Sequence, residues 1–178
     1  MQTAARGFET KEFESRTRNA QEMMHTLRLD ALFLTTEPNV RYFSGFFTQF
    51  WESPTRPWFL ILPAAGKPIA VIPEIGASGM AATWIDDIRT WASPNPEDDG
   101  ISLAAGVLNS LPCRYGRVGA TLGVESCIRM PFSHFMDLSG RMTSMQFVDI
   151  APQIHQIRSV KSPAEIEKIR TACDITHQ

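Results

Sequence analysis

The chain has 178 residues, 43% of them hydrophobic and 20% charged, which suffices for one globular domain with a substantial core. Its 17 Lys and Arg against 19 Asp and Glu give a formal net charge of -2 with interspersed signs, which argues against nucleic acid and anionic membrane surfaces as partners. The three cysteines share no metal or redox spacing, and we find neither a signal peptide nor an apolar run of membrane-spanning length. We therefore expect a cytoplasmic protein with reduced thiols.

The first part of the chain combines one long amphipathic segment with several short apolar runs. In chain order, we expect a helix that is capped by Thr10 and broken by Asp30, a strand at 31–35, a helical turn at 37–45, and strands at 58–62 and 68–72. A turn rich in Pro, Ala and Gly joins the last two strands, and this predicts an antiparallel β-hairpin.

The following part of the chain alternates helices with strands. The helices are expected at residues 75–84, 101–110, 132–138 and 154–158, and the strands at 87–91, 117–122 and 146–150. Together with the hairpin, this alternation predicts an α/β sandwich with a mixed β-sheet.

The last helix has the clearest start signal in the sequence. Ser162-Pro163-Ala164-Glu165 forms a capping box with proline at the first helical position, and Ile166, Ile169 and Cys173 then share one face. The sequence ends at Gln178 without an element that could cover this face. We therefore expect a longer parent protein.

The sequence contains no complete catalytic constellation. Its four histidines are scattered, and none has a second ligand at the spacing of a metal motif. Neither a nucleophile elbow nor a phosphate-binding glycine loop is present. We therefore assign no catalytic residue, no metal ligand and no cofactor to this chain.

Aromatic side chains and one arginine are concentrated in the stretch from residue 46 to residue 58. Phe50, Trp51 and Trp58 supply rigid apolar area, and Arg56 stands between two prolines that stiffen the backbone. One interpretation is a substrate-facing surface on which Arg56 binds a carboxylate through a forked hydrogen bond. The other is a hairpin whose aromatic residues are core and whose arginine is a solvated loop charge.

Two stretches together resemble a known family. Residues 39–46 read NVRYFSGF, which is similar to the pattern N-I-x-Y-x-S/T-G. Residues 157–172 read IRSVKSPAEIEKIRTA, which is similar to lR-x-i-K-S-x-x-E-I-x-x-i-R-x-A. Both patterns, in this order, are typical of the creatinase, prolidase and Xaa-Pro aminopeptidase family. Residues 29–32, LDAL, also resemble the family's entry to its first strand, with Arg28 where glycine is frequent.

The resemblance implies a two-domain parent protein. Residues 1–158 would form the N-terminal domain, a three-layer sandwich with a ribonuclease H-like mixed sheet, and residues 159–178 would be the linker and first helix of a C-terminal catalytic domain. In the family, that second domain binds a pair of divalent metals, often manganese, which activate a water for attack on an amide or amidine carbon. The parent would thus be a dinuclear-metal hydrolase, either an Xaa-Pro peptidase or a creatinase-like enzyme.

The resemblance also implies a role for the aromatic stretch. In creatinase-like members the N-terminal domain of one subunit reaches the active site of the other in a homodimer, and an aromatic residue and an arginine hold the substrate carboxylate. The matching positions are Phe50 or Trp51 and Arg56, with Trp58 beside them, in a loop slightly longer than the family's. The expected partners are the catalytic domain, a second copy of the chain, and a small-molecule or peptide substrate. The alternative function is a metal-free module that binds a peptide or protein.

Overall fold

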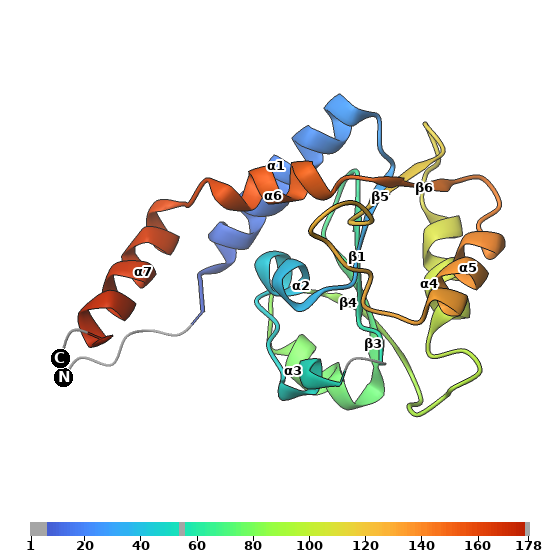
Figure 1. Ribbon diagram of the computed structural model, residues 1–178, viewed down its shortest axis with the longest axis horizontal. Coiled ribbons are helices and arrows are strands. Elements are labelled where there is room, and N and C mark those ends of the chain that lie inside the picture. Colours follow the sequence, from blue (N-terminus) through green and yellow to red (C-terminus); the bar gives the residue numbers. More distant parts are fainter. Residues whose placement is uncertain (1–6, 54–55, 177–178) are drawn as a thin grey trace.

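The computed structural model describes residues 7–53 and 56–176, which form a six-stranded sheet with helices on both faces (Figure 1). The strands are β1 (Ala31–Leu34), β2 (Phe59–Pro63), β3 (Ile69–Pro73), β4 (Asp87–Trp91), β5 (Arg117–Ala120) and β6 (Gln146–Asp149). The helices are α1 (Thr10–Leu27), α2 (Glu37–Ser44), α3 (Ala77–Ala81), α4 (Ile101–Ser110), α5 (Phe132–Arg141), α6 (Ala151–Ser159) and α7 (Pro163–Thr176), with short 3-10 turns η1 (Gln49–Glu52) and η2 (Glu74–Gly76).

The sheet is mixed because one of its strands runs against the others. The strand order is β4-β3-β2-β1-β5-β6, and β2 pairs antiparallel with both β1 and β3, whereas the β1–β5, β3–β4 and β5–β6 pairs are parallel. Every residue of β1 and β2 is buried, as their unbroken apolar sequences require of strands covered on both faces. The predicted hairpin is confirmed as β2 and β3.

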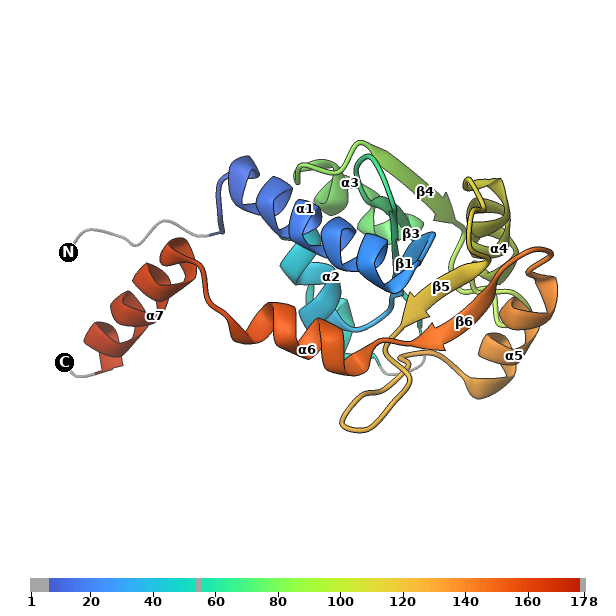
Figure 2. The same cartoon turned by 90° about the horizontal axis from the view of Figure 1, so that it is seen from above.

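Side chains alternate along the central strands and build a core on each face of the sheet. One core lies beneath α1, α2, α3 and α6, and its buried members include Met24, Leu32, Leu34, Val40, Phe43, Trp58, Leu60, Ile72, Met80 and Ile154. The other lies beneath α4 and α5 and includes Phe33, Phe59, Val71, Trp91, Ile101, Leu108, Val118 and Leu138. The two views show the resulting three layers (Figures 1 and 2), which confirm the predicted α/β sandwich.

Two expectations about the first helix are wrong. Thr10 is the first residue of α1 and not its cap; Glu9 occupies the cap position without a side-chain hydrogen bond. The helix ends because Arg28 adopts a left-handed conformation with φ 55°, and not because of Asp30. Asp30 instead accepts backbone hydrogen bonds from Arg114, Tyr115 and Arg117, at 2.9, 2.9 and 3.1 Å. Its carboxylate therefore fixes the loop that leads into β5.

The capping box of the last helix is confirmed. The Ser162 backbone N–H donates to Glu165 Oε2 at 2.9 Å, and the Glu165 N–H donates to Ser162 Oγ at 3.1 Å. No residue of α7 is buried, and the helix extends away from the sheet in both views (Figure 2). The apolar side chains of α7 consequently lie on its solvent-exposed surface.

The two family-like stretches, which are far apart in the sequence, contact the same part of the fold. Arg158 donates to the Asn39 side-chain oxygen at 3.1 Å. Arg16, which is buried in α1, donates to the Tyr42 carbonyl at 2.8 Å and pairs with Glu165 at 3.2 Å. Residues of both stretches thus join α1, α2 and the start of α7, which gives the paired patterns a structural reason.

We expect Glu165→Ala to loosen α7 without unfolding the sheet, because the change removes the side-chain half of the capping box and the ion pair with Arg16. Amide hydrogen exchange in the first turns of α7 should accelerate roughly five- to tenfold. Glu165→Gln should have a smaller effect, since glutamine keeps the capping box and loses only the ion pair. Glu167→Ala, an exposed position on the same helix, is the control, and equal exchange in both alanine variants would contradict the prediction.

Candidate functional site

The aromatic stretch lies at the edge of the sheet where β1 and β5 end. These two strands are parallel, and the antiparallel β2 begins at the same edge, as the pairing of Leu34 with Leu60 shows. The loop before β2 therefore meets the loop from β5 to α5, which projects from this edge (Figure 2). Ligands of open α/β sheets commonly bind at the carboxyl ends of parallel strands.

The structure separates the predicted site residues into an inner and an outer layer. Trp58 is 1% exposed and packs against Phe46 and Trp51, with ring centroids 5.4 and 5.7 Å apart. Trp51 is 7% exposed, Phe50 is 42% exposed and Arg56 is half-buried. Phe50 and Arg56 thus lie nearest the surface, whereas Trp51 and Trp58 are buried and support them from the core.

Arg56 has no charged partner in the part of the chain that the structure describes. No ion pair there involves its guanidinium, and its Nε atom is enclosed without a hydrogen-bond acceptor. The buried indole N–H groups of Trp51 and Trp58 also lack acceptors within the described residues. Because buried N–H donors in proteins are almost always paired, the unpaired Nε of the half-buried Arg56 is suited to a ligand that supplies an oxygen acceptor, whereas the indoles of Trp51 and Trp58 are buried.

Arg129 organises this loop, and sequence reasoning missed it. Its guanidinium donates to the carbonyl oxygens of Trp51 at 2.6 Å and Arg56 at 2.9 Å, and also to the carbonyl of Ser53. The same group lies 4.9 Å from the centroid of the Trp51 ring, and the Arg129 backbone N–H donates to Thr35 Oγ1 at 3.4 Å. Burial lowers the pKa of Arg129 from its ordinary value. The only local signal is an arginine between two apolar neighbours, which does not identify its partners.

A second carboxylate holds the start of the loop that carries Arg129. Asp149, at the end of β6, accepts hydrogen bonds from the backbone N–H groups of Leu122, Gly123 and Ala151, at 2.9, 2.9 and 3.0 Å. Burial acts to raise the pKa of Asp149, but these donors outweigh it and keep the pKa below its usual range. Asp149 therefore stabilises the backbone rather than serving as a free acid or base.

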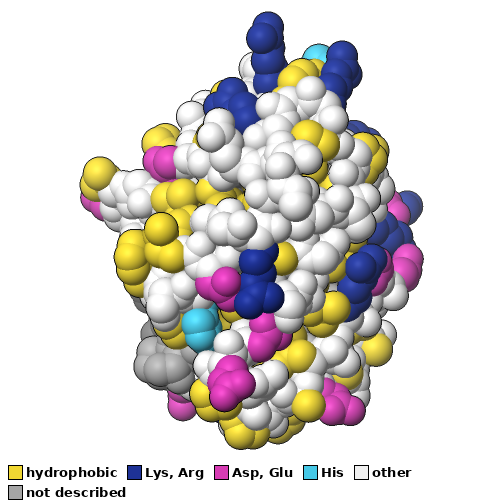
Figure 3. Space-filling model, turned by 90° about the vertical axis from the view of Figure 1, so that its right-hand side faces the viewer, with side chains coloured by type: hydrophobic (Ala, Val, Ile, Leu, Met, Phe, Trp, Pro, Cys, Tyr) yellow, Lys and Arg dark blue, Asp and Glu magenta, His cyan; other side chains and the backbone are white. Residues whose placement is uncertain are grey.

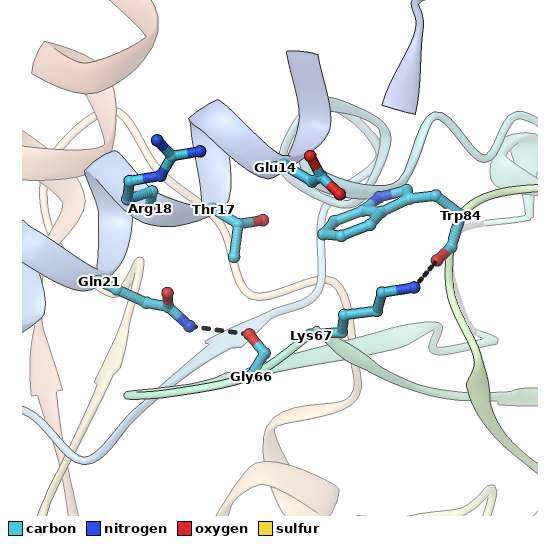
Figure 4. Close-up of a pocket in the computed structure, with 7 residues that line it drawn as sticks. All are labelled: Glu14, Thr17, Arg18, Gln21, Gly66, Lys67 and Trp84. Atoms are coloured by element: carbon cyan, nitrogen blue, oxygen red, sulfur yellow. Dashed lines mark hydrogen bonds between the residues drawn. The ribbon is translucent and has the colours of Figure 1, made fainter. Parts of the chain in front are cut away.

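An open pocket of about 290 Å³ lies elsewhere, between α1 and the turn from β2 to β3 (Figure 4). Lys67 donates to the Trp84 carbonyl at 3.3 Å and to Asp86 at 2.6 Å, and Gln21 donates to the Gly66 carbonyl at 2.9 Å. The Gln21 bond joins α1 to the hairpin, and the Lys67 bonds join the hairpin to the segment before β4. Lys67 and Gln21 are thus occupied within the protein, whereas the buried Thr17 Oγ1 has no hydrogen-bond partner among the described residues.

The described residues include no group of three or more His, Cys, Asp or Glu side chains that could hold a metal ion. None of the helices in the described ranges is long and apolar enough to cross a membrane. Cys113, Cys127 and Cys173 are exposed and free of disulfide bonds. On the face that carries α4 and α5, basic and acidic side chains are interspersed with apolar ones (Figure 3).

The sheet order and the two helical layers define a three-layer α/β domain with a mixed sheet and a loop at the carboxyl edge of its parallel strands. The family described as the creatinase/prolidase N-terminal domain matches residues 16–160, and the chain belongs to that family.

Similar proteins include an uncharacterized peptidase of Staphylococcus saprophyticus, which is 26% identical over 155 residues. This match covers 86% of the chain but only 39% of the relative. The prolidase from Thermococcus sibiricus has a TM-score of 0.72 at 17% identity, with 92% of this chain and 41% of that chain covered. The dipeptidase PepE from Mycobacterium ulcerans has a TM-score of 0.68 at 24% identity, with 90% and 40% covered.

The same fold also occurs in a solved structure that consists of this domain alone. The creatinase/prolidase N-terminal domain of an X-Pro dipeptidase from Streptococcus pyogenes has a TM-score of 0.62 at 13% identity, and the match covers 80% of this chain and 98% of that chain. A domain of this architecture can therefore fold without the rest of its parent protein.

Proposed function

We propose that this chain is the non-catalytic N-terminal part of a dinuclear-metal hydrolase, and that its aromatic loop binds the carboxylate of the substrate. Arg56 would bind the carboxylate, and Trp51 and Phe50 would supply the apolar wall beside it. The observation that carries the proposal is the guanidinium of Arg56, which has no ion-pair partner among the described residues although it stands at the carboxyl edge of the sheet.

The proposal includes a division of the chain at residue 158. Residues 1–158 would be the N-terminal domain, and residues 159–178 would begin a C-terminal catalytic domain. Two observations support this division: no residue of α7 is buried, and the family match ends at residue 160. The exposed apolar residues Ile166 and Ile169 would then pack against that catalytic domain.

The chemistry would reside outside this chain. The described residues do not fit a metal pair, and the two divalent metals, manganese among the candidates, would be bound in the catalytic domain. Substrates of the proposed class are Xaa-Pro peptides or small guanidino acids, which carry a carboxylate. In a homodimer, the loop would reach the active site of the second subunit. The free, exposed cysteines support a reducing, cytoplasmic location.

We expect Arg56→Ala in the parent enzyme to lower kcat/KM for an Xaa-Pro dipeptide, assayed with Mn²⁺, by more than about tenfold. The loss of a charge-assisted hydrogen bond to the substrate costs on the order of 2 kcal/mol. Arg56→Lys should be intermediate, because lysine keeps the charge but not the planar fork.

Arg89→Ala provides the matched control for the loss of an arginine. Arg89 lies on β4 and forms an exposed pair with Asp87, away from the loop before β2. Wild-type kinetics in Arg56→Ala would show that Arg56 is a solvated loop charge. A parent protein without metal-dependent hydrolysis would favour the alternative, a module that binds a peptide or protein.

A further inference from the structure

The segment between η1 and β2 is held by one side chain from a distant part of the chain. Within η1, the Phe50 N–H donates to Thr48 Oγ1 at 3.3 Å and the Ser53 N–H donates to the Phe50 carbonyl at 3.2 Å. Beyond this turn, the carbonyls of Ser53 and Arg56, which flank residues 54–55, both accept from Arg129. The connection spans 73 residues between Arg129 and Arg56.

The chemistry of the guanidinium explains why an arginine occupies this position. Its planar fork carries five N–H donors in a fixed arrangement, so Nη1 can bond the Arg56 carbonyl while Nη2 bonds the carbonyls of Trp51 and Ser53. Its flat face stacks on aromatic rings, and the Trp51 ring is 4.9 Å away. An ammonium group is a point charge and cannot reproduce this combination.

Arg129 is itself held in place on both sides of its loop. Its backbone N–H donates to Thr35 Oγ1, directly after β1, and Met130, the next residue, is buried in the core beneath α4 and α5. Asp149 fixes the beginning of the same loop through Leu122 and Gly123. The guanidinium is therefore presented from a supported backbone.

We propose that Arg129 is the positioning residue of the substrate loop and that it sets the place of Arg56 and Trp51 before substrate binds; this inference rests on the proposed function of the loop. Arg129 does not itself contact substrate. It fixes the carbonyl of Arg56, and hence the origin of that side chain, and it stacks on Trp51. A loop ordered in advance does not lose that freedom when the ligand arrives, which favours binding.

The first test examines the loop in the 178-residue chain and requires no activity. Chymotrypsin cleaves after Phe50 and Trp51, and mass spectrometry can follow each cut. Arg129→Ala should accelerate these cuts about tenfold or more, because local opening exposes the segment. The cleavage rate of Arg129→Lys should lie between those of the wild type and Arg129→Ala. Arg89→Ala should be cleaved at the wild-type rate. Cleavage at other sites in the same digest shows whether a variant has unfolded as a whole.

The second test uses the parent enzyme with Mn²⁺ and two matched substrates, an Xaa-Pro dipeptide and its C-terminal amide. Arg129→Ala should raise KM for the free acid about tenfold, with a smaller change in kcat, and should have little effect with the amide, which lacks the carboxylate. In the Arg56→Ala background, the further loss of Arg129 should add almost nothing. A general structural defect would affect both substrates and both backgrounds equally.

The two tests separate failure of this inference from failure of the proposed function. Unchanged cleavage of the loop in Arg129→Ala overturns the inference, whatever the kinetics show. So does an equal loss on the acid and the amide. Wild-type kinetics in Arg56→Ala, with the loop opened in Arg129→Ala, overturn instead the assignment of the loop to substrate binding.

Discussion

Replacing Trp58 by alanine is expected to lower the free energy of unfolding by about 3–5 kcal/mol, the range observed when a buried large aromatic side chain is lost. Trp58 is 1% exposed and packs between Phe46 and Trp51. A Cβ atom added to Gly76 would come within 2.2 Å of its ring, so the surrounding backbone is closely fitted to the indole. The resulting cavity would lie directly beneath the loop that precedes β2.

Chemical denaturation of the 178-residue chain measures this loss, and two variants calibrate it. Trp58→Phe keeps an aromatic ring in the core, so its free energy of unfolding should fall by less, on the order of 1–2 kcal/mol. Phe47→Ala removes a side chain that is 61% exposed and should change stability by less than about 0.5 kcal/mol. A Trp58→Ala variant as stable as Phe47→Ala would show that Trp58 faces solvent, as a direct substrate contact requires.

Asp30→Ala is expected to destabilise the fold by about 3 kcal/mol, because it leaves several backbone N–H donors in a closed loop without an acceptor. The Asp30 carboxylate binds the N–H groups of Arg114, Tyr115 and Arg117. It is 4% exposed, so water cannot readily replace it. Denaturant titration at neutral pH measures the loss, and Asp86→Asn, at an exposed pair with Lys67, is the control.

The same carboxylate gives the stability a defined pH dependence. Burial acts to raise the pKa of Asp30, but the N–H groups of Arg114, Arg117 and Tyr115 outweigh it and hold the pKa below its usual range. A group with a lowered folded pKa stabilises the fold fully above its unfolded pKa of about 3.9 and loses that contribution as the pH falls through its folded pKa.

The difference in stability between wild type and Asp30→Asn should therefore be constant from neutral pH to about pH 5 and shrink below about pH 4. Asparagine cannot ionise, so its variant lacks this part of the acid response. Urea midpoints of both proteins between pH 2 and pH 7 measure the effect. A difference that is independent of pH would show that the charge of Asp30 contributes nothing.

Local sequence patterns predicted the order of strands and helices in this fold, although not the cap and the end of α1. Two short apolar runs joined by a turn rich in Pro, Ala and Gly predicted the hairpin of β2 and β3, and Ser162 and Glu165 predicted the start of α7 with its reciprocal hydrogen bonds. These features depend on residues a few positions apart, and the local physics of turns and caps decides them. The two family-like stretches likewise identified the family from residues 39–46 and 157–172 alone.

The sequence by itself determined the order of helices and strands, the sandwich of helices on a mixed sheet, and the family. Hydrophobic periodicity and helix capping depend on residues that are close together in the sequence, so they can be read from it directly. It also indicated that Phe50, Trp51, Trp58 and Arg56 belong to one aromatic stretch. Only the tertiary structure decided their depth, with Trp58 in the core and Arg56 half-buried without an ion pair among the described residues.

The tertiary structure alone also identified Arg129 as the residue that holds the loop. Its bond to Arg56 spans 73 residues, and the bond from Arg158 to Asn39 spans 119. Such partners are set by where strands and loops meet in space and leave no periodic trace in the sequence. Arg129 binds backbone carbonyl oxygens, which every residue type has, so the residues that it holds need no particular side chain. This is the physical reason why no sequence pattern predicts its role.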